Sequence, residues 1–181
     1  MMCDVRLTSG AWLVVAALLL AGGVTGCAED TAEPLRLQGN GGMVVDPVDT
    51  GVWFRTSGCL AKGSNPLDVM VTGVTTSPRN GHVATLATWN DDSPVVLAKP
   101  GRPPAAYEPV TATSHTGGTL AGCSLDIAVV LSPDSAPVVV RTVTVHYEVD
   151  GEARSARTAL DAVLCPAGTH ASGRGEGCDD S

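Results

Sequence analysis

The chain has 181 residues, a formal net charge of −8 and few aromatic residues. A surface of this sign repels phosphate backbones, and no basic stretch carries interleaved aromatic residues, so nucleic-acid binding is disfavoured. The length is enough for one domain with a real hydrophobic core, whereas two domains would be cramped.

An apolar run, Ala11–Ala21, lies close to the N-terminus behind Arg6. Its eleven residues rise only about 16 Å as a helix, while the hydrocarbon core of a bilayer is about 30 Å thick. The run is therefore too short to span a membrane, and it is typical of the apolar segment of a cleaved signal peptide.

The run is followed by Val24-Thr25-Gly26-Cys27, which resembles the lipobox of bacterial lipoproteins. The resemblance implies that residues 1–26 are a signal peptide and that Cys27 becomes acylated after cleavage. Two or more acyl chains hold a protein stably on a bilayer. We therefore expect the lipid bilayer as a partner, through Cys27, and a location on the extracytoplasmic face of the cell membrane, or on an outer membrane where the source has two. An ordinary secretory signal peptide and a retained anchor are the alternatives.

The next segment, residues 27–42, is polar and glycine-rich and has no apolar period. It is expected to be a flexible tether that carries the folded body, residues 43–165. Residues 166–181 are again glycine-rich and acidic, and we expect a loose tail there, held only at Cys178.

Apolar and β-branched stretches alternate with turn residues along the body, a pattern typical of strands. The dipeptides Asn80-Gly81 and Asp150-Gly151 favour type I′ turns. An apolar position that moves to Val74 after Gly73 indicates a bulge. The seven predicted strands are Leu67–Thr76, His82–Trp89, Val95–Ala98, Tyr107–Ser114, Cys123–Leu131, Val138–Val149 and Glu152–Leu164.

The last two strands provide an internal test of the assignment. A two-residue loop at Asp150-Gly151 places Val149 opposite Glu152 and Val145 opposite Ala156. Both strands then present apolar residues on the same face, interrupted only by two arginines. The apolar set is Val139, Val143, Val145, Ala156, Leu160 and Ala162, and the arginines are Arg141 and Arg154.

Seven strands separated by turns, with no convincing helix, predict an all-β fold: an antiparallel β-sandwich of immunoglobulin-like architecture. Membership of the immunoglobulin family is not expected. Ala121 occupies the position of the tyrosine-corner residue, and two further strands follow Cys123 where an immunoglobulin domain has one.

Four cysteines follow Cys27, an even number that favours disulfides in an oxidising compartment. No Cys-x-x-Cys pair is present, so a zinc site is disfavoured. Because successive strands alternate in direction, Cys59 and Cys123 should fall at one end of the sandwich and Cys165 at the other. The sequence therefore predicts the pairs Cys59–Cys123 and Cys165–Cys178.

The only candidate catalytic set lies on the last hairpin, where His146 faces Ser155 and Glu148 is diagonal to them. No nucleophile elbow and no evident oxyanion hole accompany these residues. Polar side chains on a solvated sheet face explain them more simply, so an enzyme is not the leading prediction.

Metal and cofactor sites have weak candidates at most. Asn90, Asp91 and Asp92 could offer oxygens to Ca²⁺, but the EF-hand spacing is absent and Ser93-Pro94 follows, as in a turn. His82, His115 and His170 lack partners at ligand spacing. We therefore expect neither a metal nor a cofactor.

The best candidates for binding are aromatic and loop residues. The proline-rich stretch from Lys99 to Pro109 carries Arg102 and Tyr107 and is the predicted binding loop. Trp53 belongs either to the core or to an exposed recognition patch.

Three classes of function follow from the sequence. The leading one is a membrane-anchored, non-enzymatic lipoprotein that binds an unknown protein or envelope ligand. The alternatives are an envelope hydrolase that uses Ser155 and His146, and a Ca²⁺-dependent adhesion or carbohydrate-binding module that uses Asp91 and Asp92.

Overall fold

The structure is a computed structural model that describes residues 33–38, 43–45, 51–77, 83–89, 98–111, 113–132, 134, 136–172 and 177–180. These residues form strands and turns, and none of them belongs to a helix long and apolar enough to cross a membrane.

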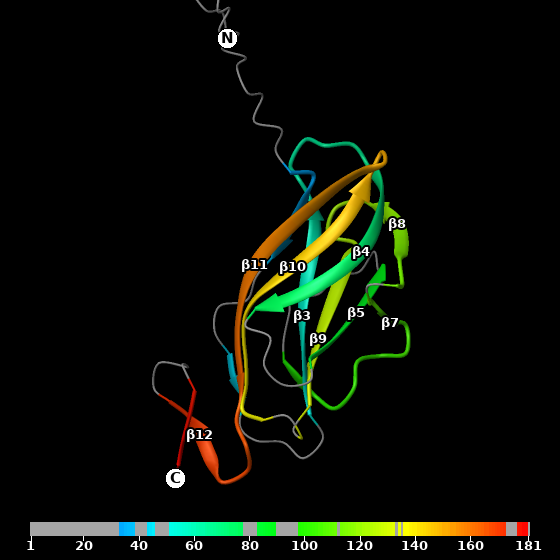
Figure 1. The fold of residues 1–181 in the computed structure, drawn as a ribbon. Coiled ribbons are helices and arrows are strands. Elements are labelled where there is room, and N and C mark those ends of the chain that lie inside the picture. The colour runs from blue at the N-terminus through cyan, green and yellow to red at the C-terminus, as the bar shows by residue number, and fades with distance from the viewer. Residues whose placement is uncertain are drawn as a thin grey trace, which may run out of the picture. The chain divides into compact units, whose positions relative to one another are not determined.

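Two sheets pack face to face, which confirms the predicted all-β sandwich (Figure 1). Sheet A has the order β1-β3-β9-β5-β7, with β6 also paired to β3, and sheet B has the order β2-β11-β10-β4-β8. The strands are β1 (Leu35–Gln38), β2 (Met43–Val45), β3 (Val52–Leu60), β4 (Leu67–Ser77), β5 (Val83–Trp89), β6 (Lys99–Pro100), β7 (Glu108–Pro109), β8 (Thr116–Leu120), β9 (Leu125–Leu131), β10 (Val138–Val149), β11 (Glu152–Leu164), β12 (Thr169–Ala171) and β13 (Cys178–Asp180).

The strand order is that of an immunoglobulin-like sandwich. In sheet B, β4, β10 and β11 lie side by side like strands C, F and G, and in sheet A, β3, β9 and β5 lie like strands B, E and D. One connection differs, because β8 follows β5 in the chain and yet returns to sheet B beside β4. The arrangement of these strands is like that of immunoglobulins, but the order in which the chain connects the strands differs at β8.

The β10–β11 hairpin has the predicted register, with Val149 opposite Glu152 and Val145 opposite Ala156. Asp150 and Gly151 have φ values of 53° and 77°, as a type I′ turn requires. The prediction was wrong for Val139. A register shift between Val140 and Thr142 changes which side chains of β10 point into the core. Val138 and Val140 are therefore buried, and Val139 is only partly buried.

The predicted bulge near Gly73 is also confirmed. On β10, His146 pairs with Gly73 and the next residue, Tyr147, pairs with Val71, so Thr72 is the extra residue of β4. The bulge keeps Val71 and Tyr147 in the core, where both are fully buried.

The folded body begins earlier than predicted. Leu35–Gln38, assigned to the tether, forms β1 and pairs with β3. Leu35 is fully buried and Leu37 packs against the core. Two leucines separated by one residue are thus enough to hold this strand on the sheet, although the neighbouring sequence is polar. The neighbouring β2 runs parallel to β11 at the edge of sheet B.

Strand β3 is central to sheet A and was missing from the seven predicted strands. It pairs with β1, β6 and β9. Conversely, among the described residues of the stretch predicted as Tyr107–Ser114, only Glu108–Pro109 forms a strand. The Ser114 hydroxyl accepts a hydrogen bond from the Thr111 N–H and donates one to the Pro109 carbonyl, so the chain turns there instead of continuing as a strand. Residues 95–97 and the Asn80-Gly81 turn lie outside the described residues.

The C-terminal segment is not the loose tail that was predicted. Its strands β12 and β13 pair with each other, and Cys178 is bonded to Cys165. The other predicted disulfide, Cys59–Cys123, is present as well. The Cys165–Cys178 bond links the residue after β11 to β13, and the Cys59–Cys123 bond links β3 to the turn between β8 and β9.

Candidate functional site

Some predicted site residues cannot be placed. Cys27 and the Ca²⁺ candidates Asn90, Asp91 and Asp92 lie outside the described residues. Within the described ranges, no group of three or more histidine, cysteine, aspartate or glutamate side chains is arranged to hold a metal ion.

The candidate catalytic residues lie on the outer face of sheet B. His146 is paired opposite Ser155, as predicted. The imidazole nevertheless interacts with the neighbouring strand β4 on its other side: Nε2 lies 3.2 Å from the Thr75 hydroxyl, and Cδ2 would lie 3.7 Å from a Cβ placed on Gly73. The ring therefore leans away from Ser155, which is exposed on β11.

The predicted binding residues are only partly brought together. Trp53 of β3 contacts Tyr107 edge to face, with ring centroids 5.7 Å apart and an interplanar angle of 61°. Trp53 is 6% exposed, so the contact is packing between the proline-rich loop and sheet A rather than an open recognition patch. Arg102 lies in the exposed part of that loop.

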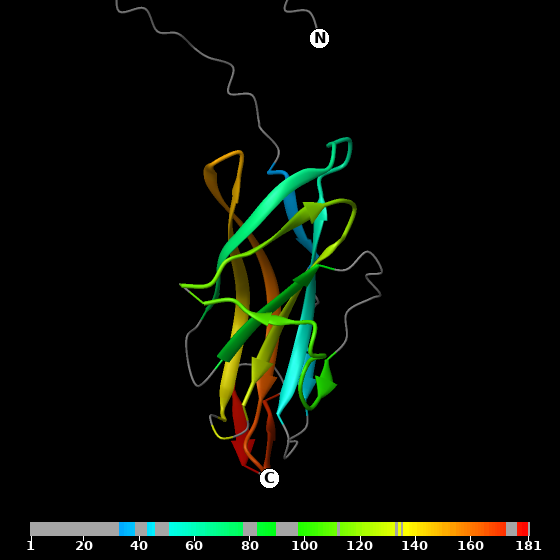
Figure 2. The same ribbon diagram turned by 90° about the vertical axis from the view of Figure 1, so that its right-hand side faces the viewer.

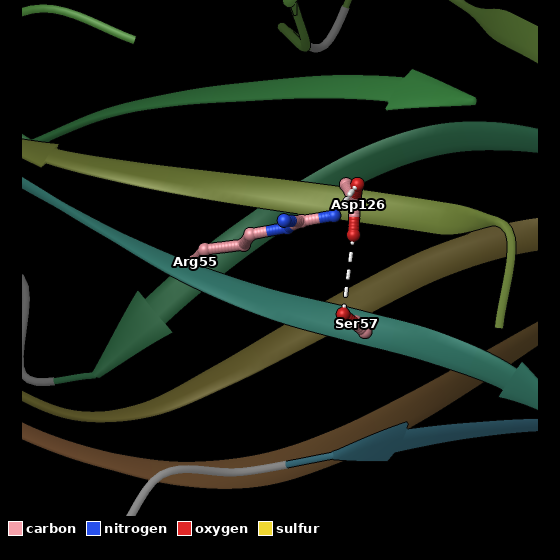
Figure 3. A network of polar contacts seen from close by, with 3 residues as sticks. All are labelled: Arg55, Ser57 and Asp126. Atoms are coloured by element: carbon pink, nitrogen blue, oxygen red, sulfur yellow. Dashed lines mark hydrogen bonds and ion pairs between the residues drawn. The ribbon is translucent and has the colours of Figure 1, made fainter. Parts of the chain in front are cut away.

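A polar cluster that the sequence did not reveal lies close to this aromatic pair. Asp126 of β9 forms an ion pair with Arg55 and accepts a hydrogen bond of 3.1 Å from the Ser57 hydroxyl (Figure 3). Asp126 faces away from the core, as strand alternation predicts, yet it is fully buried. Burial raises the pKa of Tyr107, the charge of Asp126 adds to the increase, and Arg55 partly offsets it.

The outer face of sheet B carries a shallow groove of about 390 Å³ that we call the sheet B groove. Met70, the exposed large apolar residue of the described ranges, lies on it at 38% exposure. Carboxylates lie around the Met70 side chain in this groove. One of them, that of Asp68, accepts a hydrogen bond of 2.9 Å from the Thr119 hydroxyl. The acidic residues of the groove are Asp68, Glu148 and Asp150.

A second hollow of about 340 Å³ lies where the edges of the two sheets meet. We call it the β5–β8 pocket, and the strands that contribute its lining, β5, β7 and β8, lie on the side of the sandwich that faces the viewer in Figure 2. Its lining is mostly polar and includes Thr88, Trp89, Glu108, His115 and Thr116.

Trp89 reaches from sheet A to sheet B across this pocket. A Cβ on Gly118 of β8 would lie 2.4 Å from Cδ2 of the indole and 2.7 Å from Cγ and Cε2. The ring is therefore seated directly on the backbone of β8, and only glycine leaves room for it.

Two polar atoms of the pocket residues have no hydrogen-bond partner. They are the indole Nε1 of Trp89 and the hydroxyl Oγ1 of Thr116, and both atoms are buried. Thr116 as a whole is 8% exposed. Buried polar side-chain atoms are paired in the large majority of cases, so two unpaired atoms among the residues of one pocket need an explanation. A tryptophan at a strand end and a Thr-Gly-Gly run were the only sequence signals of this site.

The fold and its hollows define a disulfide-bonded, all-β sandwich with a polar pocket between its sheet edges. No protein-family model, curated protein or solved structure shows significant similarity to this chain.

Proposed function

We propose that the protein is a lipid-anchored, extracytoplasmic binding protein without enzymatic activity. The lipobox-like Val24-Thr25-Gly26-Cys27 supplies the anchor, and the β-sandwich presents its hollows to a ligand outside the cytoplasm.

The observation that carries this proposal is the use of the cysteines. The four that follow Cys27 are bonded to one another as Cys59–Cys123 and Cys165–Cys178. Structural disulfides persist in oxidising compartments and are rare in the bacterial cytosol. None of these four cysteines is left to pair with Cys27, which supports its assignment to acylation.

A binding role is supported over catalysis by the character of the hollows. The β5–β8 pocket offers several hydrogen-bonding groups, and His146 interacts with Thr75 rather than Ser155. Binding needs placed polar groups in a concave site, while acyl transfer also needs an activated nucleophile.

The test is mass spectrometry of the protein isolated from membranes of the producing bacterium, together with fractionation of two variants. The wild-type protein and Cys3→Ala should lack residues 1–26, carry acyl chains on Cys27 and sediment with membranes. Cys27→Ala should carry no lipid and leave the membrane fraction. A wild-type protein with a free Cys27 thiol and no lipid mass would contradict the proposal.

A further inference from the structure

We propose that the β5–β8 pocket binds a small, neutral, polyhydroxylated molecule of about monosaccharide size, without a metal ion. The inference rests on the binding role proposed above and names the class of its ligand.

The unpaired atoms indicate what the ligand has to offer. The indole Nε1 of Trp89 can only donate a hydrogen bond, and the hydroxyl of Thr116 can donate or accept one. Leaving such atoms buried and unpaired costs free energy that a hydrogen-bonding ligand would recover. A ligand oxygen that accepts from Trp89 is therefore the first requirement.

The exposed residues of the pocket set the second requirement. Glu108 contributes a carboxylate, which can only accept hydrogen bonds. A ligand that spans the pocket must thus accept at Trp89 and donate at Glu108. A hydroxyl group does both, and a ring with several hydroxyls can do so at separate positions.

Charge and size narrow the class further. An anionic ligand would meet the carboxylate of Glu108 and a chain of net charge −8. The described residues contain no cluster suited to a metal ion. The volume of about 340 Å³ lies at the lower end of the range for small-molecule pockets, which suits a single sugar ring better than a long chain.

Of the pocket-lining residues, Glu108 and His115 are exposed, whereas the Nε1 atom of Trp89 and the Oγ1 atom of Thr116 are buried. Binding therefore involves a side-chain adjustment that uncovers the two atoms. The expected consequence is a change in the environment of the Trp89 indole when ligand binds.

Titration calorimetry and indole NMR signals of the purified full-length protein in detergent test the inference. The probes are glucose, galactose, mannose and N-acetylglucosamine, each in the presence of EDTA. We expect at least one of them to bind and to shift the Trp89 N–H signal.

Two variants remove one unpaired atom each: Thr116→Val keeps the shape of the side chain, whereas Trp89→Phe also shortens the ring system. Thr116→Val and Trp89→Phe should each weaken binding by about tenfold, the value of one good hydrogen bond. Thr116→Val should also melt at the wild-type temperature or slightly above it, since it deletes an unsatisfied buried hydroxyl. A residue needed only for folding would not combine lost binding with kept stability.

Thr119→Val is the matched control, because Thr119 lies on the same strand and lines the sheet B groove instead. It should leave sugar affinity unchanged. The inference is overturned if none of the four sugars binds at roughly 10 mM, or if binding survives both Thr116→Val and Trp89→Phe. If the protein is acylated but binds no sugar, only the sugar-binding inference is overturned. If it is not acylated but binds sugar, only the proposed lipid anchor at Cys27 is overturned.

Discussion

Single residues decide how the two sheet edges meet. Trp89 belongs to sheet A and Gly118 to sheet B, and the indole lies on the glycine backbone where a side chain would otherwise stand. This contact joins the two sheet edges beside the β5–β8 pocket. The shape of the pocket therefore depends on the absence of a Cβ atom at Gly118.

Gly118→Ala should lower the free energy of unfolding by about 1–3 kcal/mol, because the rigid indole has to move out of its seat. Gly117→Ala is the control: its Cβ would meet only the Val69 carbonyl oxygen, at 3.9 Å, and the change should stay within about 0.5 kcal/mol. Urea unfolding of both variants measures the difference. Equal losses for the two would show that the indole is not held as described.

At the scale of elements, β3 and β9 are joined on their outer face by the Arg55–Asp126 pair beneath the aromatic contact of Trp53 and Tyr107. Tyr107 of the proline-rich loop thus lies close to a charged cluster as well as to the apolar Trp53. Removing one partner of a buried ion pair leaves the other charge uncompensated.

Asp126→Asn should therefore lower the free energy of unfolding by about 3–5 kcal/mol. Glu152→Gln provides the comparison, since it disrupts the Arg154–Glu152 pair, in which the Glu152 side chain is 71% exposed. Exposed pairs contribute about 0–1 kcal/mol. Denaturant midpoints of both variants test the contrast, and a small effect at Asp126 would mean that the buried pair does not stabilise the sandwich.

The elements differ in how far local sequence could predict them. The bounds of the β10–β11 hairpin and its register next to the turn were predicted correctly, because the turn dipeptide and the alternating faces are local signals. Only the register shift between Val140 and Thr142 was missed. Strand β3 has buried polar residues, Thr56 and Ser57, on both faces, which hides its alternation. Strand β8 contains two glycines and depends on pairing with β4.

The pocket was beyond prediction for a related reason. Its walls come from β5, β7 and β8, which only the packing of two sheets brings together. The two disulfide pairs, by contrast, were predicted correctly, although β3 and β8 were missing from the strands whose alternation the prediction used.

For the whole molecule, both tyrosines of the chain resist ionisation. Burial raises the pKa of Tyr107 on the outer face of sheet A, and burial also raises the pKa of Tyr147 in the core, each from an ordinary value of 10.0. As the pH rises past 10, the unfolded chain therefore releases its phenolic protons before the folded protein does.

Stability should be unaffected by these groups below pH 10 and should fall as the pH rises past it, because the unfolded state then binds fewer protons than the native state. Tyrosinate absorbance should appear at higher pH in the native protein than in urea. Melting temperatures measured over the same range should decline together with it. Coincident native and denatured titration curves would contradict the raised pKa values.

The Cys59–Cys123 bond also has a consequence for resistance to proteolysis. The exposed basic residues Lys62, Lys99 and Arg102 all lie within the covalent ring that this bond closes. Lys99 and Arg102 each precede a proline, which blocks trypsin-like cleavage, whereas Lys62 precedes Gly63. A trypsin-like protease that cuts after Lys62 therefore opens the ring without separating the products. The cut molecule gains only the water consumed in hydrolysis, and its two fragments stay covalently joined until a reductant cleaves the disulfide.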